Sequence, residues 1–404
     1  MSDSGDVATG DPPEKLDCSK DERFAEFTSY YAGHRLQMRA DRQLTRAMAR
    51  AEKIRRERKG EPNGSIILVY GPSGVGKTCL RLAVERRIVK AEMAKMQEDR
   101  SYQPFCSFEP KGPDSSTTFS WPDFFERGLT SLNEPLIYHK IIVVQRDPID
   151  GIGFSLVRGG RALRSSFEKA LGYRCTSNGF IDEGHHIGEV AGAARFKLDL
   201  ENLKSLADTC NVTLILFGTY DLLSFRTLNG QLGRRLFQVH LPRYRRDRAD
   251  DVAEFKKVLR TFQGQIPLRQ VPDFEKDWEY FYTRSCGCIG VLKDWLLRAL
   301  DEVLEDGRDE LTRDDLDASA LDADELDTMA ADIIDGETQL RDSRSLDRYD
   351  LVASKLAQPP KRMLQPVTEQ EGHGMPASGR KSRRGQVAQR KPARDPGSHG
   401  YRAG

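Results

Sequence analysis

The sequence predicts an α/β fold, with an open, mainly parallel sheet covered by helices on both faces and a smaller all-helical unit after it. Three observations predict this fold. Short apolar segments alternate with helical patterns up to about residue 243. A glycine-rich loop joins the first apolar segment to a helix. Beyond residue 243 only helical patterns remain. The chain has 404 residues, more than the roughly 250–300 at which a single core stops growing, so two packed units plus tails are expected.

The N-terminal part is expected to hold a disordered tail and then a basic helix. Residues 1–22 are polar and predict disorder. In residues 23–60, apolar side chains recur at three- and four-residue spacing, as on one face of a helix. A basic stripe follows this face and consists of Arg35, Arg39, Arg42, Arg46 and Arg50. Such a stripe is either a contact for a polyanion or an ordinary solvated face.

The α/β unit is predicted for residues 61–243. Strands are expected at 65–70 and 103–108, in a short segment ending at Ile181, and at 212–217 and 237–241. Helices are expected at 78–96, 121–132, 163–171 and 198–209. The strands at 65–70 and 212–217 are apolar throughout, which is typical of strands buried on both faces of a parallel sheet. Residues 136–146 are apolar and β-branched, and both a strand and a helix fit them.

The helical unit is predicted for residues 244–339, with helices at 250–263, 274–285, 289–304 and 322–334. Residues 340–404 are polar and are expected to form a disordered basic tail. Charge is unevenly distributed. Residues 301–350 carry nineteen Asp or Glu and five Lys or Arg, whereas residues 361–404 carry ten Lys or Arg and three Asp or Glu. The basic tail could add affinity for a polyanion.

A phosphate-binding loop is predicted at residues 71–78, which fit the pattern G-x-x-x-x-G-K-[ST]. Its glycines let successive backbone N–H groups point at phosphate oxygens, and the following helix adds its positive end. Lys77 would reach the β- and γ-phosphates, and the Thr78 hydroxyl would hold Mg²⁺. The residues predicted to bind ATP in this loop are Gly71, Pro72, Ser73, Gly74, Val75, Gly76, Lys77 and Thr78.

Two acidic residues at the end of a strand complete the predicted chemistry. Asp182 would bind Mg²⁺ through water, and Glu183 would polarise the attacking water, which points to hydrolysis as well as binding. The residues before them, 175–179, are polar for a central strand, so the start of a surface helix is the alternative. After the strand at 212–217, Thr219 is the candidate for holding the attacking water, with Asp221 in reserve. Both also make good helix N-caps.

Arg234 and Arg235 are candidates for completing a neighbouring subunit's site. A guanidinium aimed at another subunit's γ-phosphate would stabilise charge in the transition state. A surface arginine pair is the competing interpretation of these two residues.

His185 and His186 stand next to the two acids and raise the question of a metal site. Adjacent side chains on a helix or a strand do not face the same way, and no further histidine lies near. We therefore do not expect a metal site at this pair.

The sequence resembles the AAA+ ATPases of DNA transposition, the TniB/TnsC-type regulators, from about residue 24 to 335. The first two motifs of this resemblance are common to many ATPases, and the later ones point to this family. The motifs are residues 71–78, Ile181-Asp-Glu-Gly-His-His186, Leu203-Lys-Ser-Leu-Ala-Asp208, Leu216-Phe-Gly-Thr-Tyr-Asp-Leu-Leu223, Gly230-Gln-Leu-Gly-Arg-Arg235, Leu241-Pro-Arg-Tyr244 and Gly287-Cys-Ile-Gly-Val-Leu-Lys-Asp-Trp295.

The resemblance implies the P-loop NTPase fold of the AAA+ type with a helical lid. It implies that Thr219 falls on the first sensor and that Arg234 or Arg235 lies near the position that acts in trans. Lys293 lies near the second sensor, where an arginine is more usual, and is a candidate for nucleotide binding. Gly184 stands where alanine is usual.

The resemblance also implies partners. The family assembles on duplex DNA as ATP-bound rings or filaments and links target choice to the transposase, so duplex DNA, a transposase, target-selection proteins and further copies of this chain are expected. DNA contact would go mainly to phosphates. The candidate contacts are Arg35, Arg39, Arg42, Arg46, Lys111 and Thr117.

Two other classes of function stay open: another DNA-associated or secretion-associated AAA+ ATPase, and a nucleotide-dependent signalling switch that binds no DNA. The sequence has no apolar run long enough to cross a membrane and no apolar signal segment. Its seven cysteines are scattered, and reduced thiols are expected. A cytoplasmic location is therefore expected.

Overall fold

The computed structural model describes residues 19–30, 33–58, 61, 63–112, 118–140, 142–146, 153–157, 159–189, 193–226 and 236–342, with residues 345, 347 and 350. The chain divides into two compact units, Met1–Arg348 and Tyr349–Gly404. The first unit contains both the α/β part and the helical part.

A five-stranded parallel sheet forms the centre of the α/β part, with the strand order β2-β5-β6-β1-β7. The strands are β1 (Ser65–Tyr70), β2 (Phe105–Phe108), β5 (Asn178–Ile181), β6 (Thr213–Gly218) and β7 (Leu236–His240). All residues of β1 and β6 are buried, as their continuous apolar sequences predict. β1 lies between β6 and β7, so the loop that follows it starts near the middle of the sheet's carboxyl edge.

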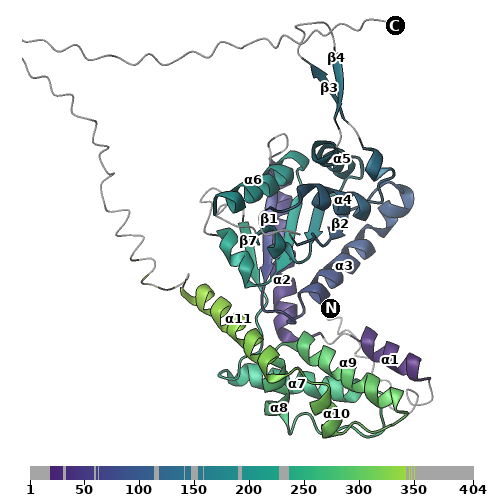
Figure 1. Cartoon of the computed structure of the whole chain (residues 1–404), viewed down its shortest axis with the longest axis vertical. Helices are drawn as coiled ribbons and strands as arrows, with labels where there is room; N and C mark the ends of the chain where they lie inside the picture. The colour runs from purple at the N-terminus through teal and green to yellow at the C-terminus, as the bar shows by residue number, and fades with distance from the viewer. Residues whose placement is uncertain are drawn as a thin grey trace, which may run out of the picture. The chain divides into compact units, whose positions relative to one another are not determined.

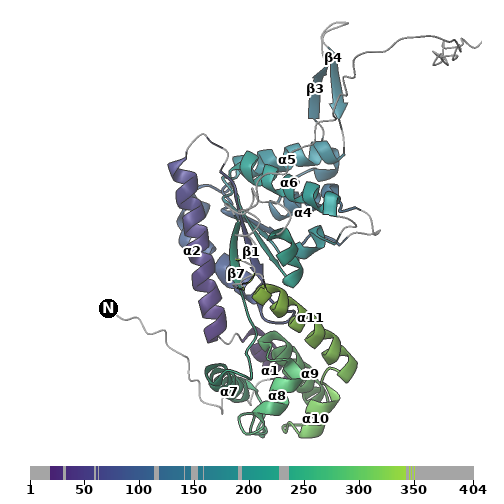
Figure 2. The same cartoon turned by 90° about the vertical axis from the view of Figure 1, so that its left-hand side faces the viewer.

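Helices cover both faces of this sheet, as Figure 2 shows, which confirms the predicted α/β architecture. Successive side chains of β1 point to opposite faces. Ile66 and Leu68 join the apolar cluster under α4 (Trp121–Ser131), α5 (Gly160–Tyr173) and α6 (Ala193–Cys210). Ile67 joins the cluster under α2 (Arg35–Glu57) and α3 (Lys77–Glu98).

The helical part consists of α7 (Ala249–Gln265), α8 (Trp278–Ser285), α9 (Ile289–Glu305) and α10 (Arg313–Ala318), and α1 (Lys20–Ser29) packs with them. The Phe27 ring of α1 meets the Phe262 ring edge-on, with centroids 6.3 Å apart. The single helical segment expected at 23–60 is therefore two helices. α1 packs on the core of the helical part, whereas α2 adds Leu36 to that core and packs further along against the sheet. α1 also begins inside the stretch 1–22 that was expected to be disordered.

Four short elements were left undecided by the sequence or were not predicted from it. The undecided stretch 136–146 contains a short 3₁₀ helix, η2 (Ile137–His139), and the strand β3 (Ile142–Arg146). β3 pairs antiparallel with β4 (Gly153–Val157), which was not predicted. This hairpin projects beyond α5 in Figures 1 and 2. The short helix α10 was also not predicted, because six residues offer too little periodicity to detect.

The last described helix, α11 (Ala323–Asp342), runs eight residues past the predicted end at 334. It contacts η4 (Tyr220–Arg226), the 3₁₀ helix that follows β6. A Cβ at Gly336 of α11 would lie 2.2 Å from the Tyr220 ring, so only glycine allows this approach. α11 thus links the helical part to the carboxyl edge of the sheet.

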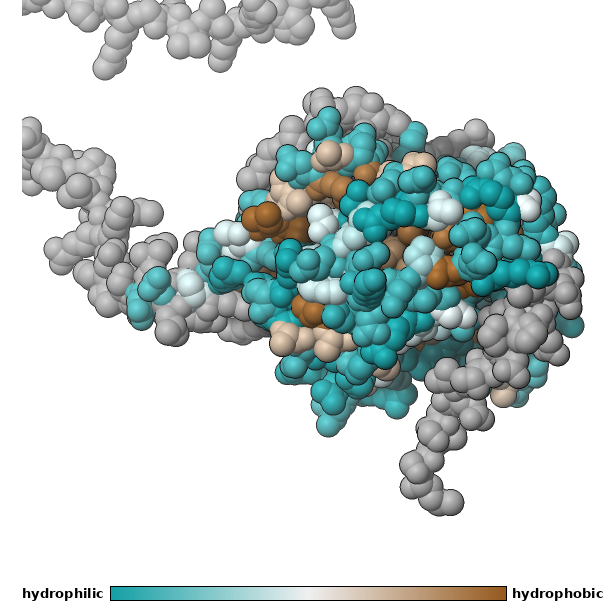
Figure 3. Space-filling view, turned by 90° about the horizontal axis from the view of Figure 1, so that it is seen from below, coloured by the Kyte–Doolittle hydropathy of each residue, from teal (hydrophilic) through white to brown (hydrophobic). Residues whose placement is uncertain are grey.

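Hydrophilic residues cover most of the face seen in Figure 3, and hydrophobic residues form small separate patches there. Among the described residues, no helix has both the length and the hydrophobicity needed to cross a membrane.

Candidate nucleotide site

The glycine-rich loop connects β1 to α3 in six residues. β1 ends at Tyr70 and α3 begins at Lys77. Gly74 and Gly76 have φ angles of 65° and 100°, in the left-handed region that glycine adopts without strain. Gly76 directly precedes α3, so the free N–H groups and positive end of the helix belong to the loop. This is the strand–loop–helix arrangement that the motif predicts for a phosphate site.

Lys77 is buried in this loop and is bonded to the loop's own carbonyls. Its Nζ donates to the oxygens of Gly71 and Pro72, at 3.1 and 2.8 Å. Burial lowers the pKa of the Lys77 ammonium, although the carboxylates of Glu183 and Asp182 oppose this. A phosphate group at the loop would offer a stronger acceptor than two carbonyls and would favour the charged amine.

Asp182 lies at the end of β5 and meets the first turn of α3. The Thr78 hydroxyl donates to Asp182 Oδ2 at 3.1 Å, and Arg81 Nε donates to the same oxygen at 3.0 Å. Asp182 Oδ1 accepts the backbone N–H of Glu183 at 3.2 Å. The structure therefore brings together Thr78 and Asp182, which the sequence places 104 residues apart.

Thr78 and Asp182 fit a Mg²⁺ ion by the chemistry of their donor atoms. A hydroxyl and a carboxylate are hard oxygen ligands, and Mg²⁺ in nucleotide sites is held by one or two such groups with phosphates and waters. Both oxygens lie at the start of α3, beside the phosphate loop. These two side chains would hold the ion.

Glu183 follows Asp182 with a left-handed backbone, φ 45°, which is uncommon for a residue with a side chain. Its carboxylate is 36% exposed, and Oε2 lies 3.1 Å from Nδ1 of His185. The Glu183 carboxylate therefore lies partly exposed at the edge of the candidate site and is not buried in the core. A strained backbone of this kind is frequent at functional sites.

Thr219 lies just past the end of β6, and β6 is the strand between β5 and β1 in the sheet. Its hydroxyl donates to Asp221 Oδ2 at 2.5 Å, and the Asp221 N–H points back at the Thr219 oxygen at 3.4 Å. Thr219 therefore caps the start of η4 while its side chain stays at the sheet edge. The two interpretations made from the sequence, water-holding residue and cap, are compatible in this geometry.

The α/β part of the chain is similar to a known family: residues 61–225 match the family model described as "AAA domain". Together with the parallel sheet and the phosphate loop, this match identifies the fold as the P-loop AAA+ fold that the sequence predicted. The helical part beyond β7 is its lid.

Solved structures with a similar chain path have low sequence identity. ORC2 of Aeropyrum pernix in ADPNP–ADP complexes is 14% identical, with 67% of this chain and 66% of that chain covered and a TM-score of 0.43. Drosophila ORC bound to DNA is 12% identical, with 79% and 68% covered and a TM-score of 0.41. Cdc6p from Pyrobaculum aerophilum is 14% identical, with 73% and 69% covered and a TM-score of 0.40. No curated protein matches the sequence significantly.

Arg81 is a part of the AAA domain's site that the sequence did not reveal. Besides Asp182, its guanidinium contacts Glu85 at 2.6 Å and the Ser107 hydroxyl at 2.7 Å. Arg81 stands one turn after Thr78 on α3, so helical spacing was the signal that could have found it. It neutralises two largely buried carboxylates beside the predicted magnesium ligands.

A cavity of about 170 Å³ lies between the phosphate loop, the tip of β6 and α11. Pro72 and Ser73 line it on the loop side, and Thr219 and Asp221 on the side of β6. The α11 residues that line it are Met329, Asp332, Ile333, Asp335, Gly336 and Gln339. The mouth of the AAA domain's site is therefore bordered by an acidic helix from outside residues 61–225.

The lid touches the phosphate loop directly. The N–H of Val291, in the first turn of α9, donates to the Gly74 carbonyl at 3.2 Å. A Cβ at Gly290 would come within 2.3 Å of that same carbonyl oxygen, so glycine is needed for the contact. The loop and the lid are thus in van der Waals contact in this structure.

Lys293, the candidate second-sensor residue, is bonded to the end of α1. Its Nζ donates to the carbonyls of Thr28 and Tyr30 at 2.7 and 2.5 Å. It also lies near Cys79, which follows Thr78 in α3. Its role in nucleotide binding stays a prediction, and here it caps a helix close to the start of α3.

Of the remaining candidate site residues, some lie within the described part of the chain and others do not. Arg234, Arg235 and Thr117 lie outside the described residues. Arg35 forms an ion pair with the buried Asp251 of α7 and so has a structural role. Lys111 is in the described part of the chain, next to the gap at 113–117.

Arg39, Arg42 and Arg46 are exposed on α2 and make no ion pair with any described residue. The guanidinium of Arg50, one turn further on, lies 5.5 Å from the ring centre of Phe237. The free part of the predicted basic stripe is therefore shorter than the sequence suggested.

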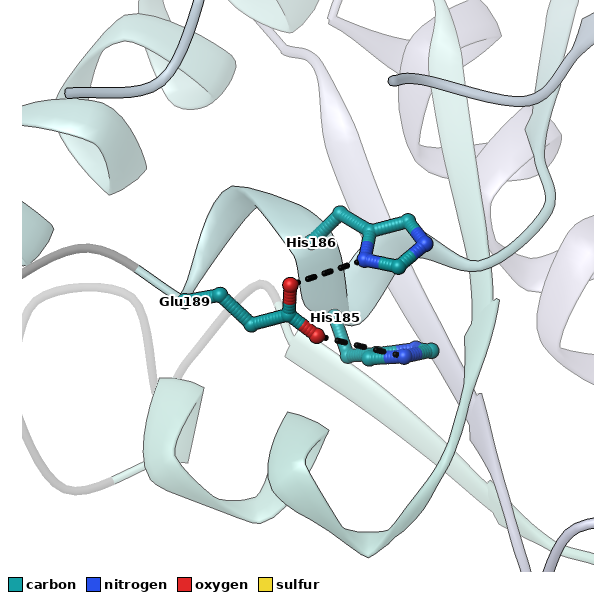
Figure 4. Close-up of side chains that lie close together, drawn as sticks. All are labelled: His185, His186 and Glu189. Carbon is teal, nitrogen blue, oxygen red and sulfur yellow. Dashed lines mark hydrogen bonds and ion pairs between the residues drawn. The ribbon is translucent and has the colours of Figure 1, made fainter. Parts of the chain in front are cut away.

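The expectation that His185 and His186 face apart is wrong, as Figure 4 shows. Both residues lie in the 3₁₀ helix η3 (Gly184–Ile187), and their ring centres are 4.5 Å apart. Both rings are directed at the carboxylate of Glu189. The sequence argument assumed a regular helix or strand. The left-handed Glu183 and the tight 3₁₀ turn that follows it produce a different arrangement.

Proposed function

We propose that this protein binds and hydrolyses ATP, and that it acts as an AAA+ regulator of DNA transposition that assembles on duplex DNA and couples target selection to the transposase. The contact between the Thr78 hydroxyl and the Asp182 carboxylate, at 3.1 Å, carries the ATPase part. It joins the phosphate loop to the acidic strand end with Glu183 as the next residue. The regulatory part is supported by the sequence motifs between residues 24 and 335.

In the proposed reaction, the loop's N–H groups and the Lys77 ammonium bind the phosphates of ATP. Thr78 and Asp182 would hold Mg²⁺, which would supply charge neutralisation at the phosphates. Glu183 accepts a hydrogen bond from the attacking water and Thr219 orients that water. Water adds to the γ-phosphorus and the bond to the β-phosphate oxygen breaks, giving ADP and phosphate. Arg234 or Arg235 of a neighbouring copy would stabilise the developing charge.

Glu183→Gln tests the catalytic assignment. The amide cannot accept the proton of the attacking water, so ATP binding should persist while turnover falls by about 100-fold or more. Binding is measured with a fluorescent ATP analogue and turnover by phosphate release. Glu201→Gln, at an exposed carboxylate on α6, is the matched control and should leave both unchanged. Wild-type turnover in Glu183→Gln would contradict the assignment.

Completion of the site in trans makes a separate expectation. Arg234→Ala or Arg235→Ala should keep nucleotide binding and lose turnover, because the missing guanidinium belongs to the neighbour's site. Mixing that arginine variant with Glu183→Gln protein should restore part of the activity. At some interfaces between the two variants, one subunit supplies an intact Glu183 and its neighbour supplies an intact arginine, so the shared site is complete. If neither variant gives any recovery on mixing, the shared site is not supported.

Contact with DNA is proposed for the exposed arginines of α2. Arg39, Arg42 and Arg46 stand at spacings of three and four residues, so they lie on one face of the helix. No described carboxylate neutralises them, which leaves three positive charges for phosphates. Contacts of this type position a protein on duplex DNA without reading its sequence.

A triple substitution of Arg39, Arg42 and Arg46 by Ala should weaken binding to duplex DNA of any sequence. It should also reduce the slope of log affinity against log salt by about 2.7, at about 0.9 for each phosphate that is no longer neutralised. The control removes Lys53, Arg56 and Arg58, three exposed cations further along the same chain segment, with the same change of net charge. Equal losses of DNA affinity in both variants would show that the affinity depends on net charge alone, and would contradict a specific role for the stripe.

The regulatory role is tested by assembly and by transposition. Electron microscopy with a non-hydrolysable ATP analogue and duplex DNA should show rings or filaments, and monomers alone would contradict assembly. A strand-transfer reaction with the transposase of the proposed mobile element should depend on the protein and ATP. Insertion that is equally efficient and equally targeted without the protein would contradict the transposition role.

A further inference from the structure

The cluster of His185, His186 and Glu189 lies beside Glu183 and has no part in the proposed hydrolysis. In Figure 4 the Glu189 carboxylate is directed at both imidazole rings. His186 Nδ1 lies 2.9 Å from Glu189 Oε2, and His185 Nε2 lies 3.5 Å from Oε1. One donor atom from each of the three residues falls within 4.8 Å of the others. Two imidazoles and a carboxylate around one point are a common donor set for divalent transition metals.

The local backbone explains why the three side chains converge. The N–H of His186 donates to the Glu183 carbonyl, and that of Gly188 donates to the His185 carbonyl, both in i to i+3 spacing. Glu189 lies two residues past the end of η3, and its carboxylate reaches back to His186, three residues earlier in the chain. His185 approaches the same carboxylate from four residues away.

The distances suit a bound ion. Bonds from Zn²⁺ to imidazole nitrogen and carboxylate oxygen are about 2.0–2.2 Å, so tetrahedral ligand atoms stand about 3.3 Å apart. The two separations between nitrogen and oxygen, 2.9 and 3.5 Å, go to different oxygens of the Glu189 carboxylate and lie on either side of this value. The three donor atoms lie within 4.8 Å of one another, so side-chain rotation would bring them to the spacing of a shared ion.

The number of N–H groups on the His185 ring also favours a bound ion. Both of its ring nitrogens face carboxylates, with Nδ1 3.1 Å from Glu183 Oε2 and Nε2 3.5 Å from Glu189 Oε1. A neutral imidazole has a single N–H, so one nitrogen would turn a lone pair toward a negative oxygen. Nδ1 is buried and lacks an aligned hydrogen bond to any described residue. An ion at Nε2 would use that lone pair and leave the proton on Nδ1, facing Glu183.

We propose that His185 Nε2, His186 Nδ1 and the Glu189 carboxylate bind a divalent transition-metal ion such as Zn²⁺, and that the bound ion restrains Glu183 through His185. A ligand histidine that donates its other N–H to a carboxylate is the usual support for a metal site. Here that carboxylate is the proposed catalytic one. Metal binding therefore slows ATP turnover, and this second part rests on the proposed function of Glu183.

Metal binding is tested on the full-length, metal-free protein. Zn²⁺ is titrated in competition with a chromophoric chelator, in excess Mg²⁺, which prefers oxygen ligands and leaves this site free. The wild type should bind about one equivalent, and His186→Ala or Glu189→Gln should lower the affinity by about tenfold or more. His139→Ala, at an exposed histidine outside the cluster, is the control and should bind as the wild type does.

Two further measurements identify the ligands. Co²⁺ in place of Zn²⁺ should give a spectrum without a thiolate charge-transfer band, because no cysteine takes part. Cys79→Ser and Cys175→Ser, at the exposed thiols, should leave the affinity unchanged. A thiolate band, loss of binding in either serine variant, or unchanged binding in both His186→Ala and Glu189→Gln would overturn the site.

The link to Glu183 has a readout that is independent of activity. Glu183→Gln removes the carboxylate that orients His185, so Zn²⁺ affinity should fall by about tenfold. Unchanged affinity there would overturn the link and leave the three-ligand site standing. In ATPase assays, Zn²⁺ should slow the wild type several-fold and have no such effect on His186→Ala. If the metal-free protein has no turnover, the proposed function fails, whereas the titrations still decide the metal site.

Discussion

Burial determines the charge state of several single residues in this protein. Lys77 and His34 are both almost completely buried, and for both burial lowers the pKa. For Lys77, the cost of burying the ammonium is partly offset by carbonyl acceptors and by nearby carboxylates. His34 lies between α1 and α2 with Nδ1 3.1 Å from the Tyr244 hydroxyl, and it forms no ion pair with a described carboxylate. A neutral histidine fits this place and a charged one does not.

His34 should make stability depend on pH. Burial lowers the pKa of His34 from 6.5 to about 4. Between these values the unfolded chain binds a proton that the folded chain does not, so stability is full above pH 6.5 and falls as pH decreases towards 4. The gap corresponds to about 3 kcal/mol. Urea unfolding at several pH values measures it.

His34→Gln should remove this part of the pH dependence, whatever it does to stability at pH 7. His139→Gln, at an exposed histidine, is the control and should keep the wild-type profile. A His34→Gln profile parallel to that of the wild type between pH 6.5 and 4 would show that His34 is not the group responsible.

Arg81 should be important for folding as well as for the site. Its side chain is 16% exposed and lies between Asp182 and Glu85, which are 9% and 12% exposed. Arg81→Ala leaves two largely buried carboxylates without a counter-charge, which typically costs about 3 kcal/mol or more. Chemical denaturation at pH 7 measures the loss.

The matched control for Arg81→Ala is Arg127→Ala, which breaks an exposed i,i+4 pair with Asp123. Pairs of that kind contribute about 0.5 kcal/mol. Similar losses in the two variants would mean that the Arg81 network contributes no more than a surface pair.

Some of the site's residues could be predicted from the sequence and others could not. The phosphate loop and Asp182 could be proposed from the sequence because short motifs point to their chemistry locally, and the structure brings Thr78 and Asp182 together. Arg81 was missed because its partners, Asp182 and Ser107, are distant in sequence. The geometry of His185 and His186 was predicted wrongly because it depends on a left-handed residue, Glu183, and periodicity does not detect single residues of that type.

At the scale of elements, long periodic segments were predicted well and interruptions were not. β1, α3 and β6 lie within about two residues of their predicted bounds, because burial on a parallel sheet requires continuous apolar sequence. The break between α1 and α2 was missed because the apolar spacing continues through it. α1 packs only on the core of the helical part, whereas α2 passes from that core, at Leu36, to the sheet, at Ala40 and Leu44, and only the tertiary packing determines this.

The position of α11 depends on one glycine, which gives an element-scale prediction. Gly336→Ala would place a Cβ 2.2 Å from the Tyr220 ring, so α11 should shift away from η4. Within the helix itself alanine is the better residue, by about 1 kcal/mol. Faster hydrogen exchange across residues 323–342 should therefore come from weaker packing and not from a weaker helix.

The control for this substitution is Gly264→Ala in α7, where a Cβ meets no atom within 4 Å. It should stabilise the protein slightly, by about 0.4–1 kcal/mol, with α11 unchanged. Unaltered exchange in α11 of Gly336→Ala would show that the Tyr220 contact does not hold the helix in place.

At the scale of the whole first unit, the core and the lid are joined at several points. The Val291 N–H bonds to the Gly74 carbonyl of the phosphate loop at 3.2 Å. Arg243, just before Tyr244, forms an ion pair with Glu337 of α11 at 2.9 Å. These contacts connect elements that the sequence assigned to separate regions, and they explain why the unit Met1–Arg348 is continuous.

Nucleotide should therefore stabilise the core and the lid together. A ligand that binds only the folded state adds about 2.7 kcal/mol at 100 times its dissociation constant. Because the lid touches the loop that holds the phosphates, urea unfolding with Mg²⁺ and ATP should show one transition, shifted as a whole. In a Trp121→Phe variant the remaining tryptophans, Trp278 in α8 and the buried Trp295 in α9, both lie in the lid, so tryptophan fluorescence reports on the lid and circular dichroism reports on all helices. Lys77→Ala, which lacks the phosphate-binding amine, should show no shift. If the tryptophan signal changed at the same urea concentration with and without ATP while the rest of the protein was stabilised, the lid would be an independent folding unit, and the contact at Gly74 would not couple it to the nucleotide.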